Sequence, residues 1–240
     1  PRLEPLVANV AKLLDEAGQA EQRILFEGAQ GTMLDVDHGT YPFVSSSNGT
    51  VGGICAGLGV PPRAIGEVLG VAKAYSTRVG SGPFPTELGG AFGEALRESG
   101  DEYGASTGRP RRVGWFDAVV VRHAARLNGL DALALTKLDV LDGLSEIKVC
   151  THYRCADQEL TDMPAGGATL ARCEPQYETL PGWSSPTAGL RRFEDLPVEA
   201  RRYIARLEEV TGQTVALVST GSDRHDTIVR PESVVERWLA

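Results

Sequence analysis

The stretch Ala132-Leu133-Ala134-Leu135-Thr136-Lys137-Leu138-Asp139 changes from apolar to polar in the middle of one short segment. Its first half is typical of a buried strand, and Gly129 is suited to end a helix over 117–128 just before it. Similar patterns predict strands at 24–26, 68–75, 147–153 and 215–218, and helices at 6–17, 87–98 and 197–211. Alternating strands and helices indicate an α/β fold with a mostly parallel sheet flanked by helices.

Polar loops follow three of these strands, at 28–48, 136–139 and 219–221. Ligands of parallel α/β sheets collect beyond the carboxyl ends of the strands. We therefore expect the three loops to converge on one site.

The composition limits the class of protein. The 240 residues are 42% hydrophobic and 23% charged, and the net charge of −8 argues against a dedicated nucleic-acid binder. No signal peptide opens the chain, and no run of about 18 apolar residues predicts a membrane span. Four cysteines at these spacings imply no disulfide framework, which suits a reducing compartment. We expect a cytoplasmic protein that binds neither nucleic acid nor membranes.

Two groups of residues invite a metal-binding interpretation. Cys150-x-His152-x-x-Cys155 has the spacing of half a zinc site, but no second ligand pair matches it. Asp35, Asp37 and His38 are a combination too common to indicate a metal, and we favour a role in ordering their loop. No metal ligand is therefore predicted in this chain.

Thr136-Lys137-Leu138-Asp139 carries the clearest chemistry. One carboxylate can accept hydrogen bonds from the ring N–H and the exocyclic amine of guanine, and the carbons of a Lys stem can cover the ring. The alternative is a strand end with a solvated Lys137 and a capping Asp139. Ser219-Thr220-Gly221 would complete the base pocket or form a simple turn.

Two further loops have the composition of ligand sites. In 104–112, Arg109, Arg111 and Arg112 lie beside hydroxyls and glycines, which predicts an anion site rather than a nucleic-acid patch or a solvated charge run. In 28–32, open backbone amides and Gln30 would read a purine or phosphate edge, or they would form a turn.

Together these stretches resemble the adenylosuccinate synthetase family, from about residue 20 to the end. The resemblance rests on 26–32, 37–42, 73–80, 82–87, 136–142 and 219–221. It implies a P-loop-NTPase-like fold, incomplete at the N-terminus, with 1–240 forming the C-terminal portion of a single domain. The half that carries the family's phosphate loop, catalytic Asp and His, and magnesium ligands would then be missing. No Gly-x-x-x-x-Gly-Lys-Ser/Thr loop occurs in the chain, so no catalytic residue is predicted here and the isolated chain is predicted to be inactive.

The resemblance also implies a function: GTP-dependent ligation of IMP and L-aspartate to adenylosuccinate, with GDP and phosphate, by a magnesium-dependent homodimer. This is the first committed step of AMP synthesis from IMP. A non-catalytic purine-nucleotide-binding module is the alternative, and the missing phosphate loop argues against a generic GTPase.

The resemblance assigns binding residues by position. Ser45 stands where the family often has Thr, and Pro110 replaces a residue that is commonly Arg. The residues implied for IMP are Gln30, Ser45, Val79 and Arg109. Those for aspartate are Ala105, Ser106, Thr107, Gly108, Arg109, Pro110 and Arg111, and those for GTP are Arg111, Lys137, Leu138, Asp139, Ser219, Thr220 and Gly221.

Overall fold

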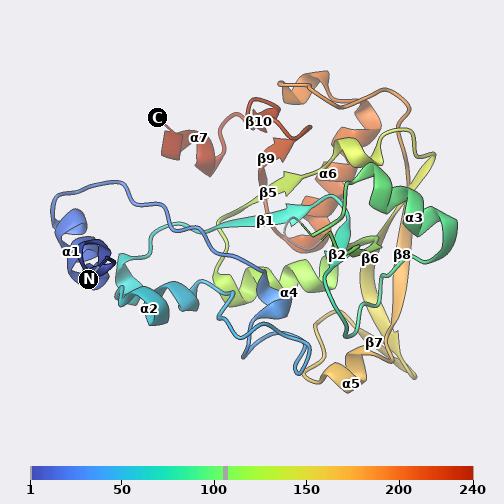
Figure 1. The fold of residues 1–240 in the computed structure, drawn as a ribbon. Helices are drawn as coiled ribbons and strands as arrows, with labels where there is room; N and C mark the ends of the chain where they lie inside the picture. The colour runs from blue at the N-terminus through green and yellow to red at the C-terminus, as the bar shows by residue number, and fades with distance from the viewer. Residues whose placement is uncertain (1, 105–107, 240) are drawn as a thin grey trace. The chain divides into compact units, whose positions relative to one another are not determined.

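The computed structural model describes residues 2–104 and 108–239. The chain divides into two units, Pro1–Val68 and Leu69–Ala240, which are described separately. Figure 1 shows the elements of both units along the chain. No helix in the described ranges has the length and apolar character that a membrane span requires.

The first unit contains short helices joined by long loops. Asn9 caps the first α-helix by accepting a hydrogen bond from the Lys12 amide at 3.1 Å, so this helix begins later than the predicted residue 6 and runs past Gly18. The strand predicted at 24–26 is wrong, because this segment has no regular structure and the side chain of Leu25 is 93% exposed. The helices are η1 (Glu4–Leu6), α1 (Val10–Gln19), η2 (Thr32–Leu34), α2 (Gly52–Leu58) and η3 (Pro62–Ala64).

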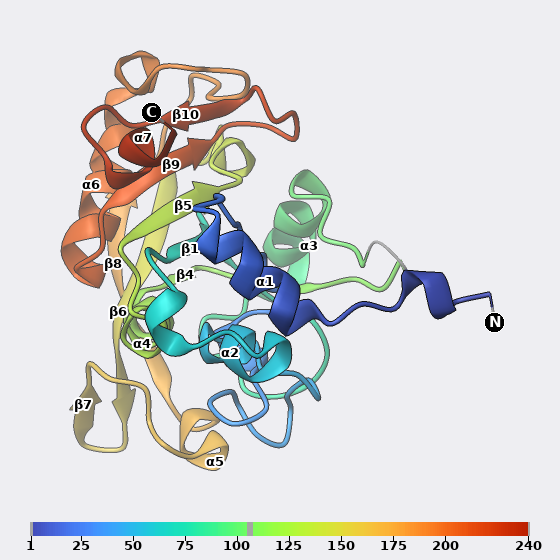
Figure 2. The ribbon, with the colours of Figure 1, turned by 90° about the vertical axis from the view of Figure 1, so that its left-hand side faces the viewer.

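The second unit is built on a mostly parallel central sheet, as predicted. Its strands lie in the order β1 (Leu69–Lys73), β5 (Ala132–Thr136), β9 (Val215–Ser219) and β10 (Thr227–Val229), and only β10 is antiparallel to its neighbour. Figure 2 shows β1, β5 and β9 side by side. The strand predicted at 68–75 forms over Leu69–Lys73, but the expectation that it is buried is wrong, because β1 lies at the edge of this sheet and Val71 is 74% exposed.

A second sheet and a short ribbon complete this unit. The sheet contains β4 (Phe116–Asp117), β6 (Glu146–Cys155), β7 (Gln158–Leu160) and β8 (Glu174–Pro181), and the ribbon pairs β2 (Ser76–Arg78) with β3 (Arg112–Gly114). The helices are α3 (Gly90–Ser99), α4 (Ala118–Asn128), η4 (Asp139–Leu141), α5 (Gly167–Leu170), η5 (Phe193–Asp195), α6 (Val198–Thr211) and α7 (Val234–Leu239).

The helix α4 and the strand β5 form as the sequence predicts. The Asp117 side chain accepts hydrogen bonds from the amides of Val119 and Val120, and Gly129 ends the helix in the left-handed conformation at φ 59°. The strand that follows is central in its sheet, with β1 and β9 on its two edges, and its residues 132–135 are buried. Its Leu133 and Leu135 belong to the same core as the inward face of α6, formed by Tyr203, Ile204 and Leu207.

Candidate functional site

The carboxyl ends of β1, β5 and β9 form the candidate site. Lys73 pairs with Thr136 at the ends of β1 and β5, and the Ala74 amide donates to the Thr136 carbonyl at 2.8 Å. The Leu138 amide donates to the Ser219 carbonyl at 3.3 Å, so the loops at 136–139 and 219–221 meet as predicted. The third polar loop, 28–48, lies in the other unit and does not follow a strand.

The backbone at Lys137 gives the 136–139 loop its shape. Lys137 has φ 60°, the left-handed conformation, which is uncommon for a residue with a side chain and is found at functional sites. The side chain of Leu138 is fully buried and anchors the loop to the core. Lys137 and Asp139, on either side of this anchor, are both partly exposed.

Asp139 has the electrostatic properties of a carboxylate that lacks donors. In the described part of the chain, only its own backbone amide donates a hydrogen bond to its side chain. Burial raises the pKa of Asp139, and the carboxylates of Asp142 and Asp226 raise it further, whereas Lys137 lowers it. A ligand that presents two adjacent N–H groups would supply the missing donors.

Asp142 fixes the segment that follows Asp139. Its side chain accepts hydrogen bonds from the Trp183 indole at 2.6 Å, the Thr187 amide at 2.7 Å and the Thr187 hydroxyl at 2.8 Å. Trp183 and Thr187 are both buried, so a single carboxylate satisfies three donors that water does not reach.

The 219–221 loop is held by contacts within the protein. The Thr220 hydroxyl donates to the Leu190 carbonyl at 2.8 Å and its amide to the Asp226 carbonyl at 2.9 Å, while the Ser219 hydroxyl donates to the Gly221 carbonyl at 2.9 Å. A Cβ at position 221 would lie 2.6 Å from a carboxylate oxygen of Asp226, so a larger residue there would require the Asp226 side chain to shift. The amide and hydroxyl of Thr220 are therefore used to shape this loop.

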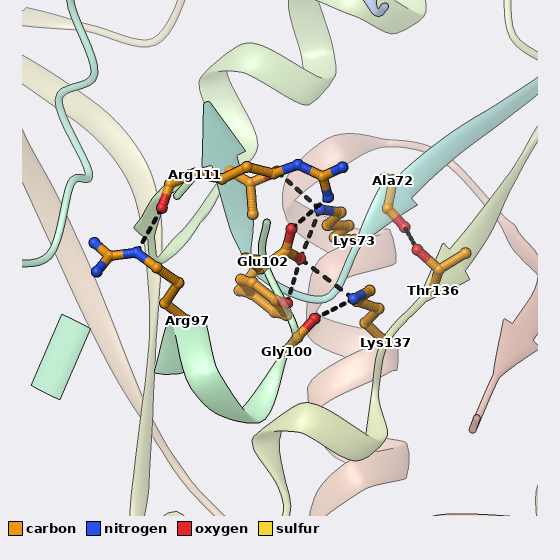
Figure 3. Close-up of polar contacts among 10 residues, drawn as sticks. Ala72, Lys73, Arg97, Gly100, Glu102, Arg111, Thr136 and Lys137 are labelled. Atoms are coloured by element: carbon orange, nitrogen blue, oxygen red, sulfur yellow. Dashed lines mark hydrogen bonds and ion pairs between the residues drawn. The ribbon is translucent and has the colours of Figure 1, made fainter. Parts of the chain in front are cut away.

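A buried glutamate, Glu102, lies between the ends of β1 and β5 and was not predicted from the sequence. Its side chain accepts hydrogen bonds from Lys73 Nζ at 2.7 Å, the Tyr75 hydroxyl at 2.6 Å and Arg111 at 2.7 Å, and Lys137 Nζ lies 3.5 Å away. Figure 3 shows the three cationic side chains pointing toward this carboxylate. We call these five residues the Glu102 cluster.

The hydrogen bonds and charges of the Glu102 cluster keep its carboxylate ionised. Burial alone would raise the pKa of Glu102, but the hydrogen bonds from Lys73, Tyr75 and Arg111 outweigh it and lower the pKa to about 2. Burial, in turn, lowers the pKa of Lys73. The side chains of Lys73, Arg111 and Lys137 remain 24%, 28% and 33% exposed, so three cations around one carboxylate leave a positive surplus facing solvent.

The cluster also closes the base of the arginine-containing loop. The Arg111 amide donates to the Glu102 carbonyl at 2.8 Å, and the Gly104 amide donates to the Arg109 carbonyl at 2.8 Å. Ala105, Ser106 and Thr107, which the family resemblance assigns to aspartate, lie outside the described residues. Arg112 differs from the anion ligand that we expected, because its guanidinium is bound to Glu87 and to the carbonyls of Gly80 and Gly82.

In the first unit, the predicted loop-ordering role of Asp35 is confirmed. Its buried carboxylate accepts hydrogen bonds from the amides of Asp37 and His38, each at 2.9 Å, and of Thr50 at 3.2 Å. Burial would raise the pKa of Asp35, but these backbone donors lower it. The acidic residue therefore holds a long loop together.

The residues assigned to IMP are divided between the two units. Ser45 donates its hydroxyl to the Leu34 carbonyl at 2.9 Å, and Gln30 is exposed and has φ 68°. Val79, which is 52% exposed, and Arg109 belong to the second unit. The assignment of these four residues to one ligand stays a prediction.

The Cys150–Cys155 segment lies in β6, where a bulge between Cys150 and His152 interrupts the strand. The Cys150 thiol donates to the His152 carbonyl at 3.3 Å, and burial raises its pKa. Throughout residues 2–104 and 108–239, no group of three or more His, Cys, Asp and Glu side chains has an arrangement that would hold a metal ion.

Comparisons with known proteins agree on one family. The family model described as adenylosuccinate synthetase matches residues 1–228. The curated adenylosuccinate synthetase of Alkalilimnicola ehrlichii is 56% identical over 227 residues, which cover 95% of this chain and 52% of that protein. That of Methylococcus capsulatus is 57% identical over 225 residues, covering 94% and 52%. The chain spans about half the length of the curated relatives it matches.

Solved structures give the same result. The fully ligated adenylosuccinate synthetase of Plasmodium falciparum aligns with a TM-score of 0.92 at 38% identity, covering 95% of this chain and 55% of that one. A cyanophage S-2L succinoaminodeoxyadenylate synthetase aligns at a TM-score of 0.57 and 20% identity, a likeness of fold alone.

Proposed function

This chain belongs to the adenylosuccinate synthetase family, and on that premise we propose that it forms part of an enzyme that joins IMP and L-aspartate. The reaction consumes GTP and yields adenylosuccinate, GDP and phosphate. We propose it for a full-length protein that carries this chain, because the chain spans only about half the length of its relatives.

The proposal that the nucleotide is GTP rests on Asp139. Its carboxylate is partly exposed, lacks donors from other described residues and has a raised pKa, so a partner with two adjacent N–H groups would stabilise its charged form. The Watson–Crick edge of guanine presents such a pair, and adenine does not. Lys137, in its left-handed conformation beside Asp139, supplies the apolar stem that would cover the base.

The proposed reaction has two steps. The γ-phosphoryl group of GTP passes to O6 of IMP, and the aspartate amine then attacks C6, loses a proton and expels O6 as phosphate. Stabilising anionic groups is the main task of a protein in phosphoryl transfer. The surplus positive charge of Lys73, Arg111 and Lys137 suits this task. We assign Arg109 and the 105–111 loop to aspartate, and Gln30, Ser45, Val79 and Arg109 to IMP.

Magnesium, which the family resemblance implies, has no fitting set of ligands among the described residues. Its participation in the reaction of the full-length protein stays a prediction. The homodimer and the cytoplasmic location likewise stay predictions.

Turnover by the purified full-length protein tests the proposed function. With IMP, aspartate and GTP, chromatography should show adenylosuccinate, GDP and phosphate in equal amounts, and ATP in place of GTP should give much less product. The isolated 240 residues should give none. A full-length protein that folds, binds GTP and forms no adenylosuccinate would refute the proposal.

A further inference from the structure

We propose that Glu102 is a positioning residue that sets Arg111 and Lys137 for a guanine nucleotide. The inference rests on the proposed function, which assigns both of these residues to GTP. Glu102 itself is fully buried, so it acts through its neighbours rather than by touching the ligand.

The geometry joins segments that are far apart in the sequence. Lys73 ends β1, Arg111 precedes β3, and Lys137 follows β5, yet all three converge on the one carboxylate (Figure 3). One carboxylate oxygen faces Lys73, Tyr75 and Lys137, and the other accepts from Arg111. The two nucleotide-facing cations are therefore held by opposite oxygens of the same side chain.

Electrostatics makes this carboxylate necessary for the arrangement. Lys73, Arg111 and Lys137 carry like charges within a partly buried space, and the charges of Arg111 and Lys137 help to lower the pKa of Lys73, after the larger effect of its burial. Without the charge on Glu102, both cations lose their ion pair, and a neutral side chain such as glutamine offers one acceptor oxygen in place of the two that face Arg111 and Lys137. We expect the released side chains to move apart toward solvent.

The exposed parts of these cations identify the ligand chemistry. Between a quarter and a third of the side-chain surface of Arg111 and of Lys137 stays accessible while the rest is held. Lys137 lies in the same short loop as Asp139, the proposed reader of the base. A molecule with both a guanine base and phosphate groups matches this combination of one free carboxylate and adjacent fixed cations.

The experiment is the Glu102→Gln variant in the full-length protein, because glutamine keeps the shape of the side chain and removes its charge. The KM for GTP should rise about tenfold or more, while the KM for IMP changes less than about twofold. The dissociation constant of GDP, measured by calorimetry, should rise in parallel. Glu102→Asp, which restores the charge on a shorter side chain, should recover part of the loss.

Glu208→Gln is the matched control, because Glu208 also forms a partly buried ion pair with an arginine, Arg230, but at the start of β9 rather than at the carboxyl ends of β1, β5 and β9. It should leave the KM for GTP unchanged. An equal loss for every substrate in Glu102→Gln, with a lower melting temperature and no recovery in Glu102→Asp, would reduce the cluster to a purely structural role and overturn the inference.

The two proposals fail in different ways. A wild-type protein that binds GDP but makes no adenylosuccinate refutes the proposed function, and the GDP affinity of the variants still decides the role of Glu102. An active wild type with an unaltered Glu102→Gln variant refutes only the inference. A full-length protein that binds no guanine nucleotide overturns both.

Discussion

The backbone amide of Leu138 donates to the carbonyl of Ser219 at 3.3 Å, which joins the loops that follow β5 and β9. Leu138 is fully buried, so this junction is anchored in the core. The partly exposed Asp139 therefore projects from a fixed base, an arrangement that suits selective recognition of a ligand better than a free loop does.

Asp139→Asn should reduce the preference for guanine. The amide offers one acceptor where the carboxylate offers two, and its NH2 group would face the exocyclic amine of guanine. We expect kcat/KM for GTP to fall about 10–100-fold relative to xanthosine triphosphate, which presents a carbonyl at that position. Competition assays with both nucleotides measure the ratio. The exposed Asp157→Asn variant is the control, and an unchanged ratio in Asp139→Asn would exclude the base-reading role.

Asp142→Ala should destabilise the protein by about 2–4 kcal/mol, because buried donors of Trp183 and Thr187 lose their acceptor. Asp142→Asn keeps one acceptor oxygen and should lose less. Denaturant unfolding of the full-length protein measures both variants. Equal stabilities of wild type and Asp142→Ala would show that other groups or water satisfy these donors.

Gly100→Ala should disturb the Glu102 cluster without changing any charge. An added Cβ would lie 2.2 Å from the Tyr75 hydroxyl, which is buried and donates to Glu102. Overpacking of this kind costs about 1–3 kcal/mol, which should appear as a lower melting temperature. Gly57→Ala is the control, because its added Cβ would meet no atom within 4 Å apart from its chain neighbours and the backbone of its own helix. A Gly100→Ala variant as stable as the wild type would mean that Tyr75 can move aside.

Asp117 should make stability depend on pH. Burial raises its pKa to about 6 against the ordinary 3.8, although hydrogen bonds from Tyr153 and two backbone amides oppose the rise. Because the folded protein takes up this proton before the unfolded chain does, the Asp117 contribution to stability improves as pH falls from 6 to about 4.

Comparison with Asp117→Asn isolates that contribution. When the pH is lowered from 7 to 4, the wild type should gain roughly 2–3 kcal/mol of unfolding free energy relative to the variant. Denaturant unfolding at several pH values measures this shift. A difference that stays constant over the range would contradict the raised pKa.

Local signals in the sequence predicted part of this structure. Asp117 and Gly129 act on their own helix, and the burial of 132–135 follows from a short apolar run, so α4 and β5 were predicted with nearly correct bounds. The rule that loops meet at the carboxyl ends of parallel strands also predicted the contact between 136–139 and 219–221.

Longer-range features were missed or mistaken. Ile24, Leu25 and Phe26 have strand propensity, but a strand needs a neighbour to pair with and none is present in their described surroundings. Glu102 draws its partners from three separate segments, which no local pattern reveals. Polar Lys73 and Tyr75 at the end of an apolar strand were the available hint, since buried polar groups require partners.

Because the backbone at Lys137 is left-handed, a substitution that raises the stability of the protein at this position would weaken its recognition of the nucleotide. Glycine would adopt φ 60° without strain, so Lys137→Gly is a substitution that stability engineering would favour. The same change deletes a cation of the Glu102 cluster and the stem proposed to cover the base. Higher stability therefore favours glycine at position 137, whereas selectivity for the nucleotide favours lysine, and protein engineers would have to choose between the two.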